Sequence, residues 1–254
     1  MLERKSPRHQ VAGVAAILME THLPPQPPPD ISAPPPGPHA IRSRRKMSSI
    51  LWVGAICCIA LLGLVAWPVF LKERAAADRT YALSNLKQLN LSLIDFENDY
   101  GRFPDDSTIS SVKASTHTTI PLGTTTSNDY FRQLIAIGNK EGFFWAKTTT
   151  TPCKPDDNIT GTHALDKGEC SYAYVAGLST TDDPGTPIAL APMISGTWKF
   201  DSKPYENYAV RLRVDGSAMP ARLDPHAEVI VLGKNLFDST LPFWKTKPDL
   251  KWPE

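Results

Sequence analysis

The feature that most constrains this chain is an uncharged apolar run from Ser48 to Leu71. Its 24 residues would form a helix about 36 Å long, because an α-helix rises about 1.5 Å per residue. A hydrocarbon core about 30 Å thick needs about 20 such residues to cross it. The run therefore predicts one transmembrane helix, assigned to residues 47–72.

The charges beside this run predict its orientation. Residues 1–46 carry seven Lys or Arg against three Asp or Glu, which leaves 20 basic and 23 acidic residues for the rest of the chain. Four of the basic residues, between Arg42 and Lys46, lie directly before the run. Because cytoplasmic flanks retain positive charge, we expect a cytoplasmic N-terminus and an external C-terminal part. A cleaved secretory signal is the competing interpretation, but its apolar core would have only about 7–15 residues.

The segment 1–46 contains ten of the chain's 24 prolines. Such a composition favours polyproline II and buries little apolar surface, so we expect a disordered, Pro-rich, basic cytoplasmic arm. It serves either as a spacer, which we favour, or as a ligand for a proline-recognising partner. Met19 is an alternative start within it.

Beyond the membrane, residues 73–104 predict an amphipathic helix that continues the apolar one. Its apolar residues recur every three or four positions, which places them on one helical face. Gly101 and Pro104 would end the helix, and Pro68 would bend it within the membrane. A coiled coil is the alternative, but the repeat lasts fewer than three heptads. The predicted buried face consists of Leu86, Leu89, Leu93, Phe96 and Tyr100.

Residues 105–254 predict a loop-rich part with short antiparallel strands. Ser107–Ser127 is rich in Ser and Thr and is expected to be a surface loop. Asn128–Asn139 predicts a short helix capped by Asn128 or Asp129. Strands are expected at 142–147, 170–176, 187–191, 208–214, 217–223 and 228–232.

Two local features stand out in this part. Asp215-Gly216 lies between two alternating segments and suits a two-residue type I′ hairpin turn. Cys153 and Cys170 predict a disulfide if the domain faces an oxidising compartment. With His163 and Asp166, these cysteines are also candidate zinc ligands, although no compact Cys-x-x-Cys pattern is present.

The sequence offers no support for an enzyme or a nucleic-acid-binding protein. Its six histidines are scattered, and the G-x-S-x-G motif typical of serine hydrolases is missing. The part beyond the arm is mildly acidic, so there is no basic footprint for nucleic acid.

Three stretches carry a resemblance to a known family. The run NLKQLNLSLIDFENDYGRFP (Asn85–Pro104) is the most specific, and SYAYVAGLSTTDDPGTPIALAP (Ser171–Pro192) and ENYAVRLRVDGSAMPARL (Glu206–Leu223) accompany it. Together with the apolar run, they resemble type IV pilins and the pseudopilins of type II secretion over residues 48–254. The resemblance implies an α+β pilin-like fold, in which a long N-terminal helix packs on a small antiparallel β-sheet.

The resemblance also implies a function. The chain would be a non-enzymatic, single-pass protein of a bacterial inner membrane, a subunit or accessory component of a pilus or type II secretion-like assembly. Its partners would be the membrane and other pilin-like subunits, as homo- or hetero-oligomers. A stand-alone, membrane-tethered binding module on a pilin scaffold is the alternative. Small residues suited to close helix contact are Gly54, Ala55, Ala60 and Gly63.

Two further points concern the family's known features. Some pseudopilins bind calcium in Pro/Gly-containing loops, which makes Asp182 and Asp183 weak calcium candidates. No other cofactor is expected. The family's peptidase cleavage site has glycine before phenylalanine and glutamate five residues into the mature chain, whereas Arg45–Leu51 contains none of the three. The sequence thus resembles a pilin that lacks the processing motif.

Overall fold

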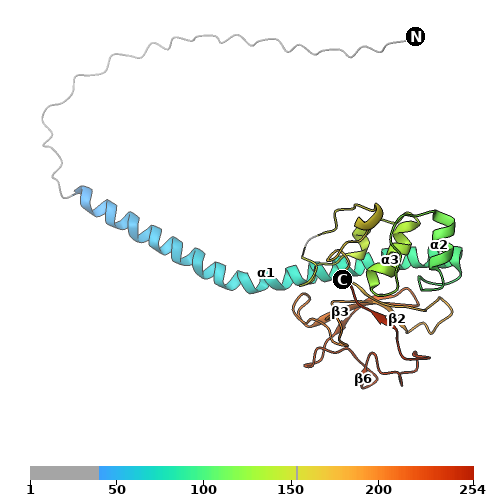
Figure 1. Cartoon of the computed structure of the whole chain (residues 1–254). Helices are drawn as coiled ribbons and strands as arrows, with labels where there is room; N and C mark the ends of the chain where they lie inside the picture. The colour runs from blue at the N-terminus through green and yellow to red at the C-terminus, as the bar shows by residue number, and fades with distance from the viewer. Residues whose placement is uncertain (1–39, 153) are drawn as a thin grey trace, which may run out of the picture. The chain divides into compact units, whose positions relative to one another are not determined.

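The computed structural model describes residues 40–152 and 154–254 (Figure 1). The chain divides into two units, Met1–Cys58 and Ile59–Glu254. Helix α1 extends over Ala40–Tyr100. Residues 40–46 are therefore helical rather than part of a disordered arm, since this stretch contains no proline and several good helix formers. The remainder of the predicted arm lies outside the described residues.

Helix α1 ends four residues before the predicted boundary at 104. Gly101 has a φ of 82°, and its N–H donates to the Glu97 carbonyl at 2.7 Å. This left-handed residue satisfies a carbonyl that the helix end would otherwise leave free. Glycine adopts the conformation without the strain that a Cβ would introduce.

A second helix, α2 (Ile109–Thr116), occupies the segment predicted to be a Ser/Thr-rich loop. The loop prediction is wrong for these eight residues, where packing outweighs their weak helix propensity. It is confirmed for residues 117–126, which form neither helix nor strand. Val112 is fully buried, and the Thr108 hydroxyl before the helix hydrogen-bonds Gln133 Oε1 at 2.7 Å.

Helix α3 (Ser127–Ala136) matches the predicted helix, but its N-cap is Thr126 rather than Asn128 or Asp129. Thr126 Oγ1 accepts from the Asp129 N–H, and the Asp129 carboxylate accepts from the Thr126 N–H. This reciprocal capping box accounts for the position of Asp129 in the first turn.

The strand predicted at 142–147 is also wrong. The chain there forms a 3₁₀ turn, η1 (Glu141–Phe144), and a second turn, η2 (Gly161–His163), follows later. The aromatic residues that suggested a strand instead fill the core, where the rings of Phe144 and Phe131 stack with centroids 5.0 Å apart.

The main sheet is antiparallel, with strand order β4-β3-β2-β1-β7. A separate two-stranded sheet pairs β5 with β6. Four of the six predicted strands correspond to β1–β4 and another to β5, whereas β6 and β7, with two residues each, were not predicted. The bounds are β1 (Ala173–Val175), β2 (Pro187–Ala191), β3 (Tyr208–Arg213), β4 (Ala218–Arg222), β5 (Ile230–Val231), β6 (Lys234–Asn235) and β7 (Leu250–Lys251).

The sheet is covered on both faces. Side chains alternate along β1, so Tyr174 joins the core beneath the helices while Ala173 and Val175 join a second core. The first core contains the buried face of α1 with Phe131 of α3, and the C-terminal segment supplies Leu236 and Trp244 to the second. Figure 1 shows α2 and α3 on one side of the strands and β6 on the other.

The hairpin between β3 and β4 has a three-residue loop rather than the predicted two-residue turn. The Gly216 N–H donates to the Arg213 carbonyl at 2.9 Å, and the Arg213 N–H donates to the Ser217 carbonyl at 3.1 Å. Gly216 has a φ of 77°, whereas Asp215 does not have the positive φ that a type I′ turn requires. The geometry is that of a turn closed by a left-handed glycine.

Candidate functional site

The apolar part of α1 is the most distinctive surface of the described chain. One helix there, over Leu51–Tyr100, is long and apolar enough to cross a membrane, and none of its most apolar window is buried. Leu51, Leu64 and Trp67 are 71%, 73% and 65% exposed. Contiguous apolar surface of this size is unfavourable in water, so it calls for contact with lipid or protein.

The four small residues predicted for helix contact lie on this surface. Gly54, Ala55, Ala60 and Gly63 are all exposed, and a Cβ added at either glycine would meet no atom within 4 Å. These positions are therefore accessible to a neighbouring helix. Their role in helix contact stays a prediction, as does the bend at Pro68, which lies within α1.

Beyond the apolar run, α1 has two distinct faces. The predicted core face lies in the interior, where Leu86, Leu89, Leu93 and Phe96 are fully buried and Tyr100 is partly buried. We call the opposite side the outer face of α1. It consists of Thr80, Ser84, Lys87, Leu91, Ile94, Asp95 and Asn98, all of them exposed.

The outer face combines apolar and charged groups. Leu91 is 63% exposed and Ile94 is 36% exposed, and residues three apart lie side by side on a helix. Lys87 and Asp95 lie four positions to either side of Leu91. This arrangement offers a neighbouring helix an apolar contact with a charge of each sign beside it.

A buried polar contact fixes α1 against the turn that follows α3. Asn85 is almost fully buried, and its side-chain N–H groups donate to the carbonyls of Gly142 and Trp145 at 3.1 and 2.7 Å. Both carbonyls belong to the η1 region, which has no strand neighbour to satisfy them. This contact holds the inner face of α1 in register with the domain.

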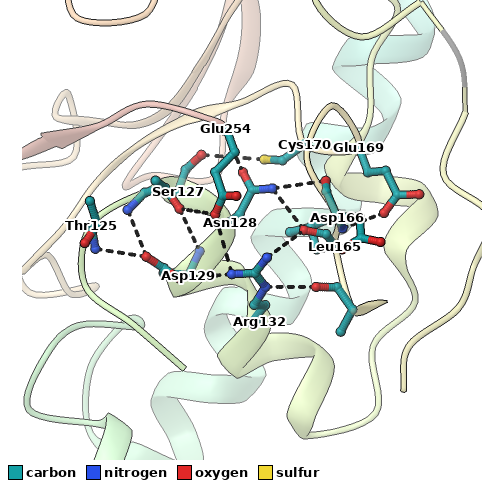
Figure 2. Close-up of polar contacts among 12 residues, drawn as sticks. Thr125, Ser127, Asn128, Asp129, Arg132, Leu165, Asp166, Glu169, Cys170 and Glu254 are labelled. Carbon is teal, nitrogen blue, oxygen red and sulfur yellow. Dashed lines mark hydrogen bonds and ion pairs between the residues drawn. The ribbon is translucent and has the colours of Figure 1, made fainter. Parts of the chain in front are cut away.

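A second polar cluster joins α3 to the segment before β1 (Figure 2). Arg132 donates from Nε to the Ala164 carbonyl at 2.8 Å and from Nη2 to the Leu165 carbonyl at 3.1 Å. Its Nη1 also pairs with Asp129 at 3.0 Å. Asn128 donates to the Leu165 carbonyl at 3.0 Å and accepts from the Glu254 N–H at 3.2 Å. The backbone around Leu165 is thereby held by α3 and the C-terminus together.

The two predicted calcium ligands are engaged in other contacts. Asp182 pairs with Lys245 Nζ at 2.7 Å and accepts from the Ser179 N–H at 2.9 Å. Partial burial opposes its ionisation, but these hydrogen bonds outweigh burial and hold its pKa below the usual value. Asp183 accepts from the Gly185 N–H at 2.8 Å, as an aspartate does in a tight turn. Calcium binding by this pair stays a prediction.

Asp182 borders an open hollow of about 360 Å³. Its lining comes from the end of β1 and from the segment before β7, and includes Thr186 and Phe243. The volume falls in the lower part of the range found for small-molecule sites.

Across residues 40–152 and 154–254, no disulfide is present. Cys170 is fully buried, with Sγ 3.6 Å from both the Ser127 hydroxyl and the Tyr172 carbonyl. Burial raises the pKa of its thiol to about 12, which disfavours the thiolate that zinc requires. Cys153 lies outside the described residues, so the predicted disulfide stays a prediction. The exposed His163 lies 3.3 Å from Asp166 instead.

The structure brings together three acids that the sequence did not point to. Glu141, Asp156 and Glu169 each place a carboxylate oxygen within 4.8 Å of the others. It is the one group of three or more potential metal ligands among the described residues, and it excludes Asp182 and Asp183. No compact spacing marks it, because the members are separated by 15 and 13 positions in irregular chain.

Comparison of the chain with protein-family models, with curated proteins and with solved structures found no match. The resemblance to pilins therefore stays a prediction from the sequence. At the level of architecture, the protein has a long N-terminal apolar helix and a small antiparallel sheet.

Proposed function

We propose that this protein is a non-enzymatic, single-pass subunit or accessory component of a pilin-like assembly in a bacterial inner membrane. The arm would lie in the cytoplasm and the sheet domain in the periplasm or outside the cell. In this role α1 is both the anchor and the element through which neighbouring subunits meet.

The proposal is supported above all by the different exposure of the two parts of α1. Its apolar run leaves large side chains exposed, whereas its later part buries one face in the domain and presents the outer face to the surroundings. A tether alone needs only the apolar run. An outer face with exposed Leu91 and Ile94 is suited to contact with a second helix.

Within the membrane, the small residues would allow close helix approach. Packing of small residues drives such association, because lipid removes most of the hydrophobic driving force between helices. Gly54 and Gly63 provide open positions of this kind. Family members also use a membrane-embedded glutamate for assembly, and the corresponding Ser48–Leu51 stretch contains no acid. Contacts outside the membrane would therefore carry a larger share of the association.

Cysteine crosslinking in native membranes tests this proposal. In a C57A/C58A background, Leu91→Cys places a thiol on the outer face. Leu232→Cys places one at the exposed turn between β5 and β6, beside the second core rather than the core under α1. We expect a short bis-maleimide to yield covalent dimers from L91C, because each chain then offers one accessible thiol on the outer face, and mainly monomers from L232C. Only monomers from L91C and from a matching A60C variant would overturn the assembly role in favour of a stand-alone tethered module.

Intact-mass measurement of the same membrane preparation tests the topology and processing. We expect the mass of a chain that retains the arm, because Arg45–Leu51 lacks the features of a peptidase site. Cleavage near Met47 would show that the protein is processed as a pilin despite these departures.

A further inference from the structure

The acidic cluster of Glu141, Asp156 and Glu169 lies apart from the outer face of α1 and has no part in the assembly role. Glu141 begins η1, and the other two acids lie on the segment between η1 and β1. Three carboxylates whose oxygens lie within 4.8 Å repel one another when ionised. A bound cation or protonation would relieve this repulsion.

Glu141 is the member that most requires compensation. Its side chain is fully buried, and its Oε1 accepts a hydrogen bond of 2.5 Å from the Leu165 N–H. Its Oε2 is buried and has no hydrogen-bond partner. A buried carboxylate oxygen without a partner is costly, because its hydration is lost and nothing replaces it. Burial, with the nearby Glu169 and Asp156, raises the pKa of Glu141.

Among the described residues, no ion pair with a protein cation compensates the cluster. Within the ranges that the structure describes, none of the ion pairs includes Glu141, Asp156 or Glu169. Lys154 lies nearby in the sequence, but its ammonium lies over the rings of Tyr81 and Trp145, 5.3 and 5.8 Å from their centroids.

The backbone around the cluster is held in place. Glu169 Oε1 accepts from the Asp156 N–H at 3.2 Å, and Glu169 Oε2 accepts from the Asp166 N–H at 2.6 Å. The Leu165 backbone, which donates to Glu141, is fixed on its carbonyl side by Asn128 and Arg132 (Figure 2). Each carboxylate oxygen has two lone pairs, so one hydrogen bond leaves capacity for a metal.

We propose that Glu141, Asp156 and Glu169 form a calcium site that ties η1 to the segment preceding β1. Carboxylate oxygens are hard ligands, which suit Ca²⁺ and Mg²⁺ rather than zinc. Ca²⁺ accepts irregular geometry and six to eight oxygen ligands, whereas Mg²⁺ demands a regular octahedron. Three acids supplied from separate positions of an irregular segment suit the irregular geometry that Ca²⁺ accepts. The cation would offset two of the three negative charges and would give the unpartnered oxygen of Glu141 an electrostatic partner.

Calorimetric titration of the full chain in detergent tests this site. The protein is first stripped with EGTA and then titrated with CaCl2, and in a separate experiment with MgCl2. We expect saturable calcium binding with one ion per chain, weaker magnesium binding, and a rise in the thermal unfolding temperature with calcium. If calcium produced no binding heat and no change in the unfolding temperature, the proposal would be overturned. Protonation of Glu141 would then be what reduces the negative charge of the cluster.

Two matched variants assign the binding to the cluster. Asp156→Asn and Asp183→Asn each neutralise one exposed turn aspartate, and only the first lies in the cluster. We expect D156N to weaken calcium binding about tenfold or more, because it removes a charged ligand. D183N should bind like the unaltered protein. The reverse result would move the site to the Asp182–Asp183 loop and overturn the proposal. Glu169→Gln provides an independent check if D156N does not fold.

Discussion

The phenol of Tyr172 donates a hydrogen bond of 2.9 Å to the backbone carbonyl of Ala82, 90 residues earlier in the chain. Both residues are fully buried, so the bond joins the inner face of α1 to the chain directly before β1. Burial raises the pKa of the Tyr172 phenol well above its usual value, which keeps the donor protonated. The contact connects the helix to the sheet across the first core.

Replacing Tyr172 with phenylalanine should lower the free energy of unfolding by about 1 kcal/mol, the typical net contribution of one hydrogen bond. The Ala82 carbonyl retains its acceptor role within α1, so the variant leaves no strong unsatisfied group. Thermal or denaturant unfolding of the full chain in detergent measures the change. Tyr208→Phe is the matched control, since Tyr208 is half-buried and its ring faces Arg79 at 4.3 Å. Equal stability of Y172F and Y208F would contradict this role of the bond.

The two faces of α1 predict opposite outcomes for the same substitution. Leu89→Ala removes a fully buried side chain and should cost about 2–5 kcal/mol of stability. Leu91→Ala, two positions later and 63% exposed, should change stability by less than about 0.5 kcal/mol. In the membrane, only L91A should reduce oligomer formation. Equal destabilisation by both would show that the faces are assigned incorrectly.

The extent to which the sequence predicts this fold depends on the length of each signal. The buried face of α1 repeats apolar residues every three or four positions over three turns, at Leu86, Leu89, Leu93 and Phe96. Such a long periodic segment is compatible with few structures other than a helix. The segment 142–147 has only six residues, and its aromatic content suits a strand or a buried turn equally well. The turn is favoured because it allows the ring of Phe144 to pack against Phe131.

The acidic cluster shows a different limit. The acids Glu141, Asp156 and Glu169 come together only because η1 and the segment before β1 fold against each other. Their spacing in the sequence does not predict this contact. Asp182 and Asp183 are calcium candidates in the sequence because they lie side by side in a Pro/Gly-containing loop. Their surroundings, with Lys245 and the turn at Gly185, could not be read from the chain.

Cys170 predicts a specific pH dependence under reducing conditions. Burial raises the pKa of its thiol from 9.0 to about 12, so the folded state keeps a proton that the unfolded state loses. The thiol makes its full contribution to the free energy of unfolding below pH 9, and this contribution is lost as the pH rises toward 12. At one pH unit above the unfolded value the loss would be about 1.4 kcal/mol.

The C170A variant isolates this effect, because the buried tyrosines titrate in both proteins. In a C57A/C58A background, chemical denaturation at several pH values between 8 and about 10 should show stability falling more steeply with pH when Cys170 is present. Parallel curves for the two proteins would contradict a raised pKa of the Cys170 thiol in the folded state.

The hairpin loop between β3 and β4 provides the last test, through two glycines that share one backbone conformation. Gly216 and Gly196 have φ values of 77° and 72°, which an alanine adopts at a cost of about 1 kcal/mol. A Cβ at Gly196 would meet no atom within 4 Å, whereas one at Gly216 would lie 2.9 Å from Asn90 Nδ2 on α1. G216A should therefore destabilise the protein more than G196A does, and the excess measures the close approach of the hairpin to the helix. Adding Asn90→Ala should remove that excess in the double variant while leaving the cost of G196A unchanged. Equal costs for the two single variants would mean that the Asn90 side chain moves aside freely.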